Sequence, residues 1–108
     1  MYEGFVADLQ MERVISADGI FDEGTHHCRV LRYEEDGDYI RLQLEGEDLS
    51  VISLDAKYRC YIKTKRESLL CTGVIYKRFR SGDINIIIFR IENGFYHVPG
   101  IKKSVKRT

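Results

Sequence analysis

Proline, tryptophan and long hydrophobic runs are scarce or missing in this sequence. Pro99 is the only proline among 108 residues, so no Pro-rich linker divides the chain, and its length suits one compact domain over residues 1–108. No apolar run approaches the ~20 residues that span a bilayer. The first residues lack the basic stretch and apolar segment of a secretory signal. These absences predict a single cytoplasmic domain that does not engage a membrane.

Cysteine is also scarce, and its pattern argues against several kinds of chemistry. The three cysteines form no C-x-x-C pair, and their odd number argues against a disulfide framework. The nearest approach to a metal site is His26, His27 and Cys28 with Cys60 or Cys71, but adjacent residues of a strand point to opposite faces. A Cys–His nucleophilic pair lacks a group that would activate the thiol. We therefore expect no metal, no cofactor, no catalytic residue and no enzymatic activity.

Net charge is zero, but the sequence divides into two oppositely charged halves. Residues 1–55 hold four basic and fourteen acidic residues, a net charge of −10, and residues 56–108 hold thirteen basic and three acidic residues, a net charge of +10. In one interpretation, acidic and basic strands pair within one barrel and neutralise each other. In the other, the molecule has an acidic and a basic face, one of which binds an anion or another copy of the chain. We favour the first, and both stay open at this point.

From residue 28 onward, short β patterns alternate with turn signals. Ile40, Leu42 and Leu44 alternate with polar residues, as one face of a half-buried strand does, and the same alternation recurs over residues 57–63. The Asp36-Gly37 pair predicts a hairpin turn, and Gly73 predicts a bulge or a sharp bend. The strands expected in this way cover residues 28–33, 39–44, 57–63, 69–79, 84–91 and 95–98.

These strands predict an all-β fold, a small antiparallel six-stranded (split) β-barrel over residues 27–98. Residues 84–91 are apolar on both faces, so we expect a central strand whose outer face packs under the N-terminal segment. A turn over residues 92–94 is expected to separate it from the last strand. Residues 1–26 predict a short helix or an irregular arm, and residues 99–108 predict a basic tail.

The second half of the chain also carries a pattern of polarity that is known from other proteins. A basic alternating strand over residues 55–62 is followed by a strand of the form x-x-G-x-V/I-x-x-R over residues 70–78, and then by an apolar strand over residues 88–91. This pattern resembles the later strands of PilZ-type barrels and of the domain at the N-terminus of bacterial flagellar-brake proteins. The resemblance covers at most residues 28–98. It implies a PilZ-like barrel that acts as a regulatory or interaction domain.

The ligand motifs of that family are altered here. PilZ domains that bind cyclic di-GMP carry R-x-x-x-R and then D/N-x-S-x-x-G. The nearest matches are Arg29 with Arg32, one residue too close, and the segment 48–53, which ends in Ser53 instead of glycine. Arginine spacing decides whether two guanidinium groups converge on one ligand, and glycine lets backbone N–H groups approach an anion. We therefore expect a PilZ-like barrel without intact cyclic di-GMP motifs.

The best candidate binding surface in the sequence is a basic strand face with aromatic residues. Alternate residues of 57–63 are cationic or tyrosine, and Tyr76 and two arginines follow on the next strand. Arginine and lysine contact phosphates, and tyrosine offers a stacking surface. With the two arginines of the altered motif, the candidate ligand-binding residues are Arg29, Arg32, Lys57, Arg59, Tyr61, Lys63, Arg78 and Arg80.

Together these observations predict a non-catalytic, PilZ-like regulatory or interaction domain whose partner is another protein or a second copy of the chain. The alternative is a small barrel that binds a nucleotide or a nucleic acid on its basic face.

Overall fold

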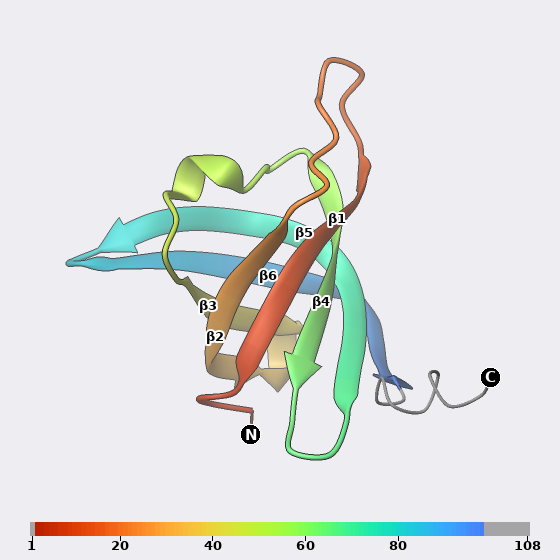
Figure 1. Cartoon of the computed structure of the whole chain (residues 1–108), viewed down its shortest axis with the longest axis vertical. Coiled ribbons are helices and arrows are strands. Elements are labelled where there is room, and N and C mark those ends of the chain that lie inside the picture. Colours follow the sequence, from red (N-terminus) through yellow and green to blue (C-terminus); the bar gives the residue numbers. More distant parts are fainter. Residues whose placement is uncertain (1, 99–108) are drawn as a thin grey trace.

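Six antiparallel strands close into a ring in the computed structural model of the chain, which describes residues 2–98 (Figure 1). The predicted all-β, six-stranded antiparallel barrel is confirmed; the basic tail expected over residues 99–108 lies outside the described residues. Around the ring the order is β1-β2-β3-β6-β5-β4. The strands are β1 (Val6–Val14), β2 (Thr25–Glu34), β3 (Tyr39–Leu44), β4 (Ala56–Lys63), β5 (Ser68–Ser81) and β6 (Ile84–Val98).

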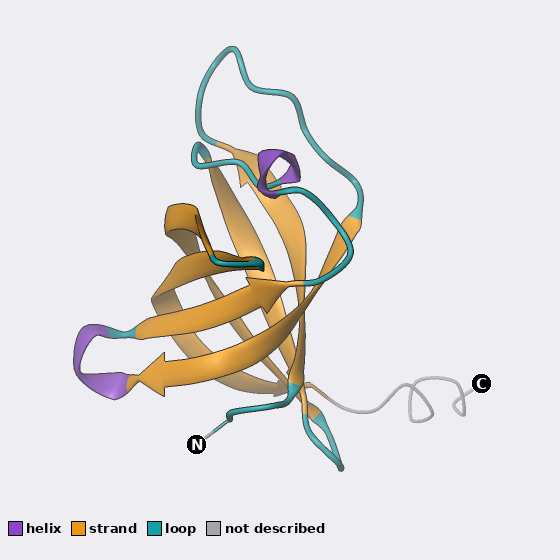
Figure 2. Cartoon of the chain, turned by 90° about the vertical axis from the view of Figure 1, so that its left-hand side faces the viewer, coloured by secondary structure: helices purple, strands orange, loops and turns teal. Residues whose placement is uncertain are grey.

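Within residues 2–98 the helical content consists of two single 3-10 turns in loops, η1 (Glu35–Gly37) and η2 (Leu49–Val51) (Figure 2). Of the residues that the structure describes, none belongs to a helix of the length and apolar character that crossing a membrane requires. The β2–β3 hairpin turns where the Asp36-Gly37 pair predicts, but the positive φ of 57° belongs to Asp38, the residue after η1.

Alternate residues of the strands fill the interior of the ring. β3 points Ile40 and Leu42 inward, and β4 points Tyr58 and Ile62 inward, in the alternation that the sequence predicts. β6 adds Phe89, which is fully buried. Burying a side chain of this size stabilises a fold by roughly 1.5–3 kcal/mol. Because apolar side chains occupy the interior, polar groups that could meet a partner are mainly on the outside of the barrel.

Residues 6–14 form a full member of the barrel, so the short helix or irregular arm expected over residues 1–26 is wrong for this segment. β1 pairs with β2 on one side and with β4 on the other. Ala7, Leu9 and Met11 face the core, and the register with β4 shifts between Met11 and Arg13. A bulge of this kind interrupts the period-two pattern. That interruption explains why the sequence shows no clean strand here.

β6 runs without a break, so the predicted turn over residues 92–94 and the separate last strand are also wrong. The register between β5 and β6 instead shifts twice between Leu70 and Gly73, and such bulges bend a strand without ending it. The bend predicted at Gly73 is confirmed. A Cβ atom at this position would lie 1.9 Å from the carbonyl oxygen of Arg90, so a glycine permits the close approach of β6.

The outer face of β6 is not covered by the N-terminal segment, contrary to the prediction. Ile86 and Ile88 lie outside the core cluster, yet they are only 7% and 8% exposed. Ile88 stands opposite Arg41 of β3 and Lys77 of β5, and long cationic side chains lay their aliphatic stems along such apolar surface. β1 cannot cover these residues because it lies across the ring from β6.

Candidate functional site

The outside of the barrel has two kinds of charged region, and the first surrounds Asp8 of β1. Asp8 is only 6% exposed, and its carboxylate oxygens lie 2.7 Å from Nδ1 of His27 and 2.9 Å from Nζ of Lys63. Burial alone would raise the pKa of Asp8, but the hydrogen bonds from Lys63 and His27 outweigh burial and lower it. The charged carboxylate therefore connects β2 and β4 to β1.

Two further carboxylates neutralise residues that the sequence predicts to bind a ligand. Nζ of Lys57 lies 2.5 Å from Oε1 of Glu92, and Nε of Arg29 lies 3.2 Å from Oε2 of Glu45. Of the predicted cations on β4, Arg59 is the one that no carboxylate within residues 2–98 holds. The predicted basic face of β4 therefore carries little free positive charge.

Arg78 and Arg80 do not join the β4 face, contrary to the prediction. The register places residues 68–74 of β5 opposite β4. Arg78 stands opposite Ile87, a core residue, and its Nη1 donates to the carbonyl oxygens of Leu49 and Ile52. It thereby fixes the β3–β4 loop, which carries η2, against the β5–β6 hairpin (Figure 1). Arg80 donates to a carbonyl oxygen of its own hairpin turn.

The two elements matched to the cyclic di-GMP motifs lie toward different ends of β3. Arg32 stands opposite Arg41, whereas residues 48–53 follow the end of β3 and contain η2. At about 3.3 Å per residue, the three residues from Arg41 to the end of the strand separate them by roughly 10 Å. Arg29 lies nearer the loop but is held by Glu45. The structure thus does not bring these elements together around one site.

The second charged region lies across β2, β3, β6 and β5, and it contains four cations on adjacent strands. Across these strands, Arg32 stands opposite Arg41, Arg41 opposite Ile88, and Ile88 opposite Lys77. In the next row Arg90 stands opposite Tyr39. None of the four cations forms an ion pair with another residue between 2 and 98, and Arg32 has a weaker electrostatic interaction with Glu3. We call this surface the cationic face and define it by Arg32, Tyr39, Arg41, Tyr76, Lys77 and Arg90.

The placement of Arg32 and Arg41 is unfavourable in the isolated barrel. Like charges directly opposite each other on neighbouring strands destabilise a sheet. Nε of Arg41 is also buried and finds no hydrogen-bond partner in the described part of the chain, and an unmet buried donor costs about 1–3 kcal/mol. Lys77 has an aromatic neighbour instead of an acid, with Nζ 5.5 Å from the ring centre of Phe79. A bound anion would relieve the repulsion between these cations.

Two tyrosines stack within the cationic face. The ring centres of Tyr39 and Tyr76 are 5.4 Å apart, and the rings are tilted by 58°. Tyr76 lies where the register shifts between Ile75 and Lys77, and it is 56% exposed. The bulge therefore leaves a large aromatic ring in solvent beside several cations.

No protein-family model, no curated protein and no solved structure matches this chain. The PilZ-like character expected from the sequence therefore stays a proposal, and the function has to be argued from the geometry of the surface.

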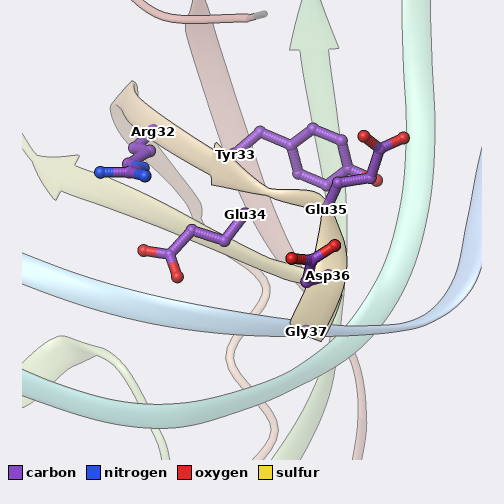
Figure 3. Close-up of a pocket in the computed structure, with 6 residues that line it drawn as sticks. All are labelled: Arg32, Tyr33, Glu34, Glu35, Asp36 and Gly37. Carbon is purple, nitrogen blue, oxygen red and sulfur yellow. The ribbon is translucent and has the colours of Figure 1, made fainter.

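The β2–β3 hairpin borders the cationic face with negative charge. Residues 32–37 of this hairpin line a pocket of about 320 Å³ (Figure 3). The side chains of Arg32 and Glu34 extend to one side of the hairpin, and those of Tyr33 and Glu35 extend to the other (Figure 3). Three adjacent carboxylates at residues 34–36 make this hairpin acidic, so the sheet surface next to it is the more favourable place for a phosphate.

A buried histidine joins two loops at the other end of β2. His26 is 4% exposed, with Nδ1 2.8 Å from Oε1 of Glu47 and Nε2 2.6 Å from Oδ2 of Asp22. Burial opposes protonation, but the two carboxylates outweigh it and raise the pKa of His26. The protonated ring thereby ties the β1–β2 loop to the β3–β4 loop. Within residues 2–98, no cluster of three His, Cys, Asp or Glu side chains is placed to hold a metal ion.

The three cysteines are free and lie in the core. Burial raises the pKa of the Cys28 thiol. A hydrogen bond with Cys71, which stands directly opposite on β5, together with burial raises the pKa of Cys60. Thiols that stay protonated inside a core are poor nucleophiles and poor metal ligands.

Proposed function

We propose that this chain is a non-catalytic, PilZ-like interaction module whose cationic face binds a polyanionic partner. The single observation that carries the proposal is the group of four cations on adjacent strands, none of which forms an ion pair with a carboxylate of residues 2–98, whereas Arg29, Lys57 and Lys63 elsewhere on the outer surface each form one. Since unpaired like charges destabilise a sheet, their position on adjacent strands is best explained by a negatively charged partner.

The binding mode differs from the one that the family resemblance implies. The surface lies on the outside of the sheet, and of the arginines in the altered motif it uses only Arg32, because Arg29 is held by Glu45. The proposed partner is recognised by charge spread over four strands rather than by a single pocket. Cyclic di-GMP is accordingly the small-ligand control in the test below.

The test compares two variants that each remove two positive charges. Arg41→Gln with Arg90→Gln removes charge from the cationic face, and Lys65→Gln with Arg66→Gln removes it from the exposed β4–β5 turn. Calorimetric titration with long-chain inorganic polyphosphate should show binding that weakens steeply with salt, since bound cations displace counterions. We expect the first variant to bind at least about tenfold more weakly, or 1.4 kcal/mol, and the second to bind like the natural chain.

Two results would contradict the proposal. Equal losses in the two variants would mean that net charge, and not the cationic face, determines binding. Tight binding of cyclic di-GMP with no binding of polyphosphate would mean that the altered motif residues still form a specific nucleotide site.

A further inference from the structure

The cationic face combines unpaired charge with an exposed aromatic pair, and this combination supports a narrower inference, which rests on the function proposed above. We propose that the cationic face binds single-stranded nucleic acid, with phosphates on Arg41, Lys77 and Arg90 and a base stacked on Tyr76. Base–aromatic stacking beside a cationic surface is the general way in which proteins hold single strands.

The width of the surface favours a ligand with several phosphates. From Arg41 on β3 to Lys77 on β5 the row of opposed residues crosses two spacings between neighbouring strands. At about 4.8 Å each, these spacings span roughly 10 Å. Successive phosphates of one strand can contact cations this far apart.

The tyrosines favour unpaired bases over both a bare polyphosphate and a duplex. Tyr76 is 56% exposed and lies against Tyr39, so its outward ring surface is free to receive a flat apolar group. A bare polyphosphate has no such group. In a duplex the faces of the bases are covered by their neighbours, so a side chain on a sheet surface cannot stack on them.

The acidic β2–β3 hairpin limits where a nucleic acid strand can run across the cationic face. Glu34 stands opposite Tyr39, on the β2 side of the surface, and two more carboxylates follow it in η1. A nucleic acid strand is repelled there, so its path leads from Arg41 across β6 toward Lys77 and β5. The same hairpin of a second copy is the rival occupant of the cationic face, because its charge is complementary.

The experiment measures fluorescence anisotropy of the full chain with labelled oligo-dT, oligo-U and an abasic strand of equal length. Tyr76→Ala is compared with Tyr96→Ala, a matched control because Tyr96 is 54% exposed and lies opposite Leu70, away from the cationic face. We expect the base-bearing strands to bind about tenfold more tightly than the abasic strand. Tyr76→Ala should remove this difference, and Tyr96→Ala and Tyr76→Phe should keep it.

The outcomes separate this inference from the function on which it rests. If abasic and base-bearing strands bind equally well, and Tyr76→Ala does not change their affinity, the inference is overturned. The proposed polyanion-binding function would then still stand. Absence of binding to any strand and to polyphosphate overturns both. Low-salt self-association in sedimentation that Arg41→Gln abolishes, with no nucleic acid binding, shows that a second copy occupies the surface and also overturns the inference. The unfolding midpoint of each variant is compared with that of the natural chain, so that a loss of binding can be distinguished from a loss of folding.

Discussion

The acidic half of the chain meets the basic half at two junctions in the ring, and the charged side chains are paired differently at the two. Where β1 meets β4, Asp8 holds Lys63 of β4, and His27 of the next strand completes the cluster. Where β3 meets β6, the outward residues of β3 include no carboxylate, and Arg41 and Arg90 stay unpaired within the described chain. Charge is paired across the β1–β4 junction and unpaired across the β3–β6 junction, where we propose that a partner binds.

The largest expected difference between the junctions is the response to removing one charge. Asp8→Asn leaves Lys63 and His27 without their shared carboxylate and should lower the free energy of unfolding by about 2 kcal/mol, the scale of hydrogen bonds to a charged group. Arg41→Gln removes a repelling charge and should leave the stability unchanged or slightly higher. Urea unfolding of the two variants measures both values, and similar losses would show that the junctions do not differ.

The dependence of stability on pH should also differ between the two regions, because His26 at the β1–β2 side bonds two carboxylates. The pKa of His26 is raised in the folded chain above its usual 6.5. The resulting stabilisation is fully present below pH about 6.5 and is lost as the pH rises through the raised folded-state value. We expect a loss of about 1 kcal/mol, measured by urea unfolding across this range. His26→Gln should flatten that dependence, and an unchanged pH profile in this variant would refute the role of His26.

The smallest expected effect comes from one lysine of β4 and one of β5, both on the outer surface. Lys57→Gln breaks the ion pair with Glu92 and should cost about 0.5 kcal/mol at low salt, as exposed pairs do. Lys77→Gln breaks no ion pair with residues 2–98 and should cost less. In 1 M salt screening is strong, so the two unfolding free energies should converge; a difference that persists in high salt would have to come from packing.

Much of the architecture could be predicted because the alternation of β3 and β4 is regular. Ile40, Leu42, Tyr58 and Ile62 all point where their spacing predicts. Prediction failed where a bulge shifts the register, as in β1 after Met11 and in β6 opposite Gly73. A glycine such as Gly73 can mark a bulge in β5, but the sequence of β1 and of β6 does not show one, because pairing with the neighbouring strand decides where the extra residue is accommodated.

The candidate surface was harder to predict than the fold. Arg78 follows β4 by one strand in sequence, but a bulge near Tyr76 turns it toward Ile87 and the β3–β4 loop. Arg41 and Arg90 lie far apart in sequence and meet because β3 pairs with β6. Which cations keep a free charge also depends on partners such as Glu92 for Lys57. Such pairings follow from the order of strands in the ring. The alternation of polar and apolar residues within one strand does not reveal that order.

The ring order also has a consequence for how the chain reaches its native state. β1, β2 and β3 are neighbours in sequence and in space, and so are β4, β5 and β6. The ring therefore closes by joining two local sheets at two junctions, where Leu9 meets Cys60 and Leu42 meets Ile87. Contacts between such distant residues form slowly because long loops must close first. The opposite net charges of the two halves attract each other in the unfolded chain, so we expect the division of charge to speed the closure of the barrel and high salt to slow it.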